Sequence, residues 1–134
     1  WPQDASTRAV GRSAAAEMHS GFPAIRNELP MNCKIDIKLP LSPEVREEVD
    51  RVEALWTELR EEFASYGPWL LGEFSILDCM FAPVGIRFSG YQVDMNSICQ
   101  SYIDYLLSDP YMEQWTHEGK KESEVILASE ISYR

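Results

Sequence analysis

The sequence predicts an all-α fold, a bundle of about five helices around a central buried helix at about residues 75–89. Apolar residues recur at spacings of three and four along most of the chain, as they do on one face of an α-helix. Alternating runs typical of strands are scarce. Ser, Asp, Gly and Pro also fall where helices usually begin and end. The 134 residues are the length of one domain.

The first helix is expected at about residues 5–27, with Asp4 as its N-cap. Proline removes a backbone donor and clashes with the preceding turn. Gly21 and Pro23 therefore predict a kink or break near Phe22. One face of this helix carries Val10, Ala14, Met18, Phe22, Ile25 and Leu29.

The second helix is expected to begin after Ser42, with Pro43 at the first helical position, and to stop at Gly67-Pro68. Residues 31–43 are predicted to form an ordered loop. The apolar face of the helix is formed by Val45, Val49, Val52, Trp56, Leu59 and Phe63. The opposite, solvated face carries Glu47, Glu48, Asp50, Arg51, Glu58, Glu61 and Glu62.

Two further helices are expected at about residues 95–107, capped by Asp94, and from Asp109-Pro110 onward. The first would turn Ile98, Tyr102 and Leu106 inward, and the second carries Met112 and Trp115. Residues 124–134 are expected to form a tail, either a short helix or an extended docked segment.

Residues 75–89 should form the interior helix. Ser75 and Asp78 are spaced as a capping box, in which each side chain bonds the other residue's backbone amide. Phe74 and Cys79 are placed for a hydrophobic staple across this cap. The helix beyond is apolar nearly all round, which predicts burial on every side.

Composition argues against several classes of function. The formal net charge is −10, so nucleic acid and anionic membrane surfaces are not expected as partners. No apolar run approaches the roughly 20 residues that cross a bilayer. Cys33, Cys79 and Cys99 form neither a disulfide framework nor a metal site, and free thiols fit a cytoplasmic location. None of the three is expected to be a catalytic nucleophile.

Residues 72–78 read Gly-Glu-Phe-Ser-Ile-Leu-Asp. This segment resembles the start of the sixth helix of cytosolic glutathione transferases, with the pattern Gly-x-x-(Ser/Thr)-x-Ala-Asp, except that Leu77 replaces Ala. Residues 69–72 and 109–112 and Trp115 also align in order. The resemblance implies a glutathione transferase C-terminal helical domain over residues 1–134, in which residues 1–4 are the remnant of an interdomain linker. The family's thioredoxin-like domain would be absent, as a start without an initiator Met also indicates.

Residues 16–22, Ala-Glu-Met-His-Ser-Gly-Phe, are similar to Ala-Thr-Glu-Leu-His-Lys-Gly-Phe of bacterial beta-class members. The resemblance implies that His19 faces the active-site cleft, where it binds glutathione or lines the electrophile site. Ser20 replaces a frequent Lys. Arg12 stands where that class has Asn, and Phe88 stands where an aromatic approaches the electrophile. Tyr91 is a further candidate for lining this site.

The implied chemistry is attack of the glutathione thiolate on an electrophilic carbon, or thiol exchange. The resemblance implies that glutathione and a small hydrophobic electrophile are the substrates, and that the reaction serves detoxification. It also implies that the parent protein is a homodimer and that the site contains no metal ion. The thiol-activating groups belong to the thioredoxin-like domain, so no catalytic residue is expected in this chain, and the isolated chain should be inactive. The helical domain would form one wall of the electrophile site.

Structural interpretations stay open beside these roles. His19 and Arg12 could be solvated, and Phe88 and Tyr91 could simply fill the core. Arg87 could pair with Asp78, with Glu17 or with a substrate carboxylate. The alternative function is a non-catalytic helical interaction module for protein assembly, like the similar domains of translation-factor subunits and aminoacyl-tRNA synthetases. A bundle unrelated to the family is a third interpretation.

Overall fold

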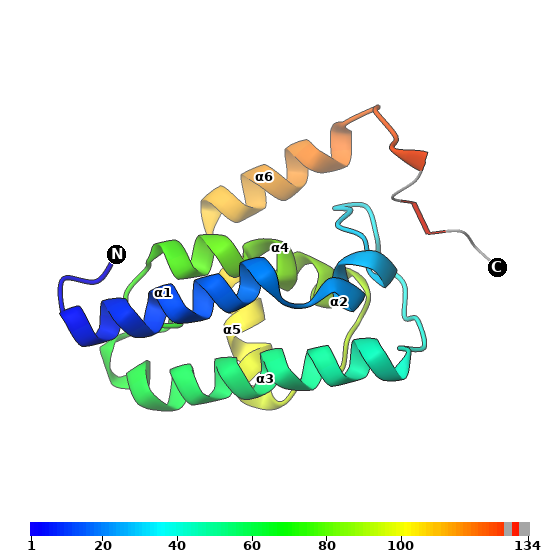
Figure 1. Cartoon of the computed structure of the whole chain (residues 1–134). Helices are drawn as coiled ribbons and strands as arrows, with labels where there is room; N and C mark the ends of the chain where they lie inside the picture. Colours follow the sequence, from blue (N-terminus) through cyan, green and yellow to red (C-terminus); the bar gives the residue numbers. More distant parts are fainter. Residues whose placement is uncertain (128–129, 132–134) are drawn as a thin grey trace.

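The computed structural model describes residues 1–127, 130 and 131, and these residues form helices with no strand longer than an isolated bridge. The order is α1 (Ala5–Ser20), α2 (Pro23–Glu28), α3 (Pro43–Phe63), the 3-10 helix η1 (Ala64–Tyr66), α4 (Ile76–Gly90), α5 (Ser97–Leu107) and α6 (Pro110–Lys121). In Figure 1, α3 forms the lowest layer, α1 and α4 lie above it, and α6 crosses the top. The α-helical fold class is confirmed.

The predicted break at Phe22 divides the first helix into α1 and α2. Phe22 has a left-handed backbone (φ 61°), which turns the chain between the two helices. No side chain of its own caps α2; instead the amides of Ala24 and Ile25 donate to the Glu48 carboxylate at 3.1 and 2.8 Å. The prediction of a solvated Glu48 is therefore wrong, because this side chain caps a neighbouring helix.

Helix α3 begins as predicted, but it ends at Phe63, and the 3-10 helix η1 carries the chain on to the predicted stop at Gly67. The Ser42 hydroxyl accepts from the Val45 amide at 3.2 Å, and Pro43 is the first helical residue. After η1 the chain turns through Gly67 (φ 142°) and Gly72 (φ 85°), values that side chains rarely allow. A Cβ at Gly67 would lie 2.4 Å from the Gly72 carbonyl oxygen, so this tight turn requires glycine.

The start of α5 lies two residues later than predicted. Asn96, and not Asp94, is the N-cap, and its side chain accepts from the Cys99 amide at 2.9 Å. Asp94 instead pairs with Lys38 at 2.8 Å. Ile98 is 37 % exposed, so the expectation that it points inward is also wrong.

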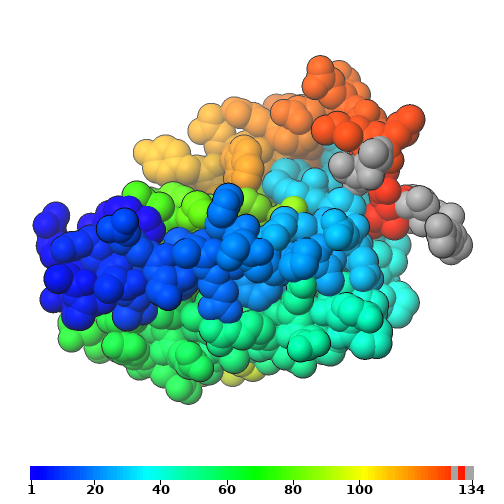
Figure 2. Space-filling view, in the orientation of Figure 1, coloured from blue at the N-terminus to red at the C-terminus, as the bar shows by residue number. Residues whose placement is uncertain are grey.

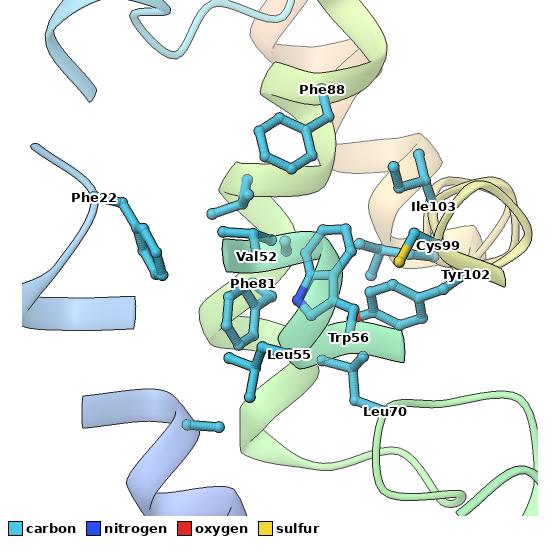
Figure 3. Packing of buried hydrophobic residues seen from close by; sticks show 14 of the residues in the cluster. Phe22, Val52, Leu55, Trp56, Leu70, Phe81, Phe88, Cys99, Tyr102 and Ile103 are labelled. Atoms are coloured by element: carbon cyan, nitrogen blue, oxygen red, sulfur yellow. The ribbon is translucent and has the colours of Figure 1, made fainter. Parts of the chain in front are cut away.

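Trp56 of α3 is the centre of the core (Figure 3). Its indole contacts Phe81 and Tyr102 edge to face, with centroids 5.4 and 5.1 Å apart, and lies 5.8 Å from the ring of Phe88. These rings come from α4 and α5, so one side chain joins three helices. Its Nε1 has no hydrogen-bond partner among the described residues.

Helix α6 is the least integrated element. Asp109 caps it as predicted, accepting from the Tyr111 amide at 2.9 Å, but α6 contains no buried residue. In the space-filling view it lies along the upper edge, apart from α3 (Figure 2).

Of the predicted tail 124–134, residues 128, 129 and 132–134 lie outside the described residues. Within the described part, no helix is both long and apolar enough to cross a bilayer.

Candidate functional site

The cap of α4 is formed and buried. The Ser75 amide and hydroxyl donate to Asp78 Oδ2 at 2.9 and 3.1 Å, and the Ser75 hydroxyl accepts from the Leu77 amide at 3.2 Å. Ser75 is 7 % exposed and Asp78 is fully buried. Both parts of the capping box are present, as predicted.

Asp78 also holds two other parts of the core. Its Oδ1 accepts from the Leu70 amide at 3.0 Å, which fixes the loop before α4, and from the Tyr102 hydroxyl of α5 at 3.2 Å. Burial raises the pKa of Asp78, and the bonds from Leu70, Ser75 and Tyr102 oppose that rise. The carboxyl group is thus the point where α4, α5 and the preceding loop meet.

One side of α4 is open, contrary to the prediction of burial on every side. Ile76 is 43 % exposed, Cys79 is also exposed, and Met80 and Pro83 are partly exposed. Because these four residues are three or four positions apart, they form one stripe along the helix. Phe81 and Phe88, on the opposite side, contact Trp56 of α3. The stripe therefore faces away from α3.

The expected staple at the cap takes a different form. Phe74 is 60 % exposed and packs edge-on against Trp69, with ring centroids 5.0 Å apart, while Cys79 is exposed on the open stripe. The Phe74 ring thus covers the loop before α4.

His19 and Arg12 lie on an exposed flank of α1, two turns apart and so on one face. Neither side chain has a hydrogen bond or ion pair among the described residues. The opposite flank faces α3, where Arg51 forms a bidentate pair with Glu17 at 2.6 and 2.8 Å. The His19 flank is therefore turned away from α3, like the stripe of α4, and α1 packs against α4.

Together these side chains form a surface that we call the open face. It is basic along α1 and apolar along α4, and it lies on the side of these two helices that is turned away from α3. Its residues are Arg12, His19, Ile76, Cys79, Met80 and Pro83.

Phe88 and Tyr91 do not belong to this surface. Each is 1 % exposed, and the Tyr91 hydroxyl donates to the carbonyl of Pro30 at 2.9 Å. The structure thus brings together two of the four candidate site residues, His19 and Arg12, and places the other two in the core.

Arg87 has neither of the predicted carboxylate partners. Its guanidinium donates to the carbonyls of Leu29 at 2.9 Å and Pro83 at 3.2 Å. Burial lowers the pKa of Arg87. Its role in the structure is to tie the end of α2 to the last turns of α4.

The thiols are poorly suited to nucleophilic chemistry. Burial raises the pKa of Cys33 and Cys99, and partial desolvation raises that of Cys79 although its side chain is exposed; both effects disfavour the thiolate. Across residues 1–127, 130 and 131, no group of three or more His, Cys, Asp or Glu residues is placed to hold a metal ion.

Sequence reasoning missed Ile76, Cys79, Met80 and Pro83 as surface residues. The apolar content of α4 does not distinguish a side covered by this chain from one left uncovered. The available signal was the i, i+3, i+4, i+7 spacing of these residues opposite Phe81 and Phe88.

Comparison with known proteins identifies a family whose model matches this chain. The family model described as "Glutathione S-transferase, C-terminal domain" matches residues 42–116. The matched segment is more than half of the chain and runs from the N-cap of α3 into α6, so it includes the Ser75–Asp78 cap. A search of the curated proteins gives no match.

Proposed function

The chain belongs to the family of glutathione S-transferase C-terminal domains, and from this premise we propose that its open face is one wall of a hydrophobic electrophile site for glutathione conjugation or thiol exchange. In this proposal glutathione is bound mainly by a thioredoxin-like domain outside residues 1–134, and that domain activates the thiol. The helical domain binds the electrophile and excludes water from it.

The observation that carries the proposal is the uncovered apolar stripe on α4. Covering such side chains is favourable, at about 25 cal/mol per Å² of apolar area removed from water. An interior helix with one apolar side open is suited to contact a second domain and an apolar substrate. Ligand sites often lie between domains and are largely apolar with a few polar groups.

His19 and Arg12 provide the polar edge of this wall. A guanidinium without a carboxylate partner, in a chain of net charge −10, is suited to an anionic cosubstrate such as glutathione. Phe88 and Tyr91 support the wall from within the core. The raised pKa values of the three cysteines agree with a thiol nucleophile supplied by glutathione.

The test is conjugation of glutathione to 1-chloro-2,4-dinitrobenzene by the protein as its gene encodes it. Met80→Gln places a polar group on the apolar stripe and should lower kcat/KM about tenfold, chiefly through KM. The matched control is Tyr66→Ser, a polar replacement on η1, which should leave both constants unchanged. Equal kinetics for Met80→Gln and the wild type would contradict the proposal, and an inactive wild type would favour an assembly module.

Two further parts of the proposal concern assembly and location. We propose a homodimer that uses α1 and α3, where a hollow of about 240 Å³ lined by Val10 and Leu55 opens between the two helices. Sedimentation should show a concentration-dependent dimer, and a strict monomer at high concentration would contradict it. A cytoplasmic location fits the free thiols among the described residues.

A further inference from the structure

A second apolar surface lies where η1, the loop after it and α5 meet. Trp69 is at its centre, with Phe74 and Tyr105 packed edge-on at 5.0 and 4.9 Å. Single exposed apolar side chains are ordinary, but a contiguous group of them marks a binding surface. We call this group the aromatic patch, and its members are Tyr66, Pro68, Trp69, Phe74, Ile98 and Tyr105.

One side of the aromatic patch borders a hollow of about 520 Å³ between the end of α3 and α5. Pro68, Ile98 and Tyr105 of the patch line it. None of its lining residues belongs to α1 or α4, which carry the open face. The elements that form the patch are therefore different from α1 and α4, which form the proposed electrophile site.

The charges around the patch are acidic. Glu61 lines the hollow, Glu73 precedes Phe74, and Asp104 precedes Tyr105. All three acidic residues are exposed, and none forms an ion pair among the described residues. Glu61 thus places a negative charge at the hollow, and Glu73 and Asp104 add two more beside patch residues in the sequence; no ion pair in the described part of the chain neutralises them.

Arg60 is the cation among the residues that line the hollow, and its guanidinium is already engaged. It donates to the carbonyls of Trp69 and Gly67 and so holds the loop that carries the patch. Burial lowers the pKa of Arg60, while the nearby carboxylate of Asp78 opposes this. Arg60 therefore supports the patch from below and does not cancel the acidic rim.

We propose that the aromatic patch docks a protein segment with an apolar anchor flanked by Lys or Arg. The anchor enters the hollow against Tyr105, Ile98 and Pro68, and the basic residues face Glu61, Glu73 and Asp104. Aromatic side chains in the centre supply most of the energy of such an interface. Complementary charges at the rim speed association and select the partner.

The test is a ¹⁵N NMR titration of the full chain with the peptide acetyl-Lys-Arg-Leu-Pro-Leu-Arg-Lys-amide. Saturable shifts should map to Ile98, Tyr105 and their neighbours. Two control peptides separate the contributions: one replaces Lys and Arg by Glu and Asp, and the other replaces the Leu-Pro-Leu anchor by Ser-Gly-Ser. Each control should bind about tenfold more weakly or worse.

Variants of the chain complete the test. Tyr105→Ser should weaken the basic peptide about tenfold, whereas Tyr111→Ser, an exposed tyrosine on α6 outside the patch, should not change its affinity. Glu61→Gln should weaken binding and flatten its dependence on salt. Equal binding of the acidic peptide, shifts elsewhere on the chain, or no saturable binding of the basic peptide would each overturn the proposal.

Discussion

Replacing Ser75 by alanine removes the cap of a buried helix. The change deletes the acceptor of the Leu77 amide and the hydroxyl that donates to Asp78. Losing an N-cap costs about 0.5–2 kcal/mol, and a buried donor left without a partner costs about 1–3 kcal/mol. Because Ser75 is 7 % exposed, water cannot readily replace the lost bonds. We expect Ser75→Ala to lower the free energy of unfolding by about 2–3 kcal/mol.

Urea unfolding followed by circular dichroism measures this cost. Ser42→Ala is the matched control, since Ser42 caps α3 through a similar 3.2 Å bond to Val45 but is partly exposed. Water can solvate the freed amide there, so that variant should lose only about 0.5–1 kcal/mol. Equal losses for the two variants would refute the argument that burial of the α4 cap sets its energetic weight.

Three other substitutions test the cap of α2 and the hydrogen bonds of Asp78. Glu48→Ala removes the acceptor of two α2 amides and should cost about 1–2 kcal/mol in urea unfolding, whereas the exposed Glu47→Ala should cost almost nothing; similar losses would show that Glu48 is not a cap. Tyr102→Phe keeps the ring and deletes one donor to Asp78, so it should cost about 1–3 kcal/mol, while Tyr105→Phe, whose hydroxyl has no bond among the described residues, should be neutral in the same assay. Burial raises the pKa of Asp78 above its ordinary value of 3.8, so the folded state keeps this proton to higher pH than the unfolded chain, and the group's contribution to stability falls as pH rises through that window. The loss caused by Asp78→Asn, measured in urea from about pH 4 to about pH 7, should therefore shrink as pH rises, and a loss that grows with pH would show that hydrogen bonding outweighs burial.

Much of the fold could be predicted from local chemistry. The caps at Asp4, Ser42, Ser75 and Asp109 lie where a short polar side chain precedes an apolar periodic run, and such signals act within one turn. The cap of α2 was not predictable in this way. It comes from Glu48, 23 residues away from Ile25, and only tertiary packing brings the two together.

The candidate site was predicted less completely than the fold. The motif around His19 implied a side chain facing a cleft; the structure shows His19 exposed on the same flank as Arg12, and Phe88 is buried against Trp56. An apolar residue in an interior helix has the same sequence signal whether it faces core or cleft. The distinction depends on which neighbours cover the helix, and the uncovered side of α4 became visible only in three dimensions.

The most direct measurement on the open face is NMR of the methionine methyl groups during titration with S-hexylglutathione, in the protein as its gene encodes it. The chain has five methionines, so the spectrum is simple, and each signal can be assigned by substitution. We predict a saturable shift of the Met80 methyl, which lies on the apolar stripe, and no shift of Met95, which lies in the loop before α5. An unchanged Met80 signal at ligand saturation would contradict it.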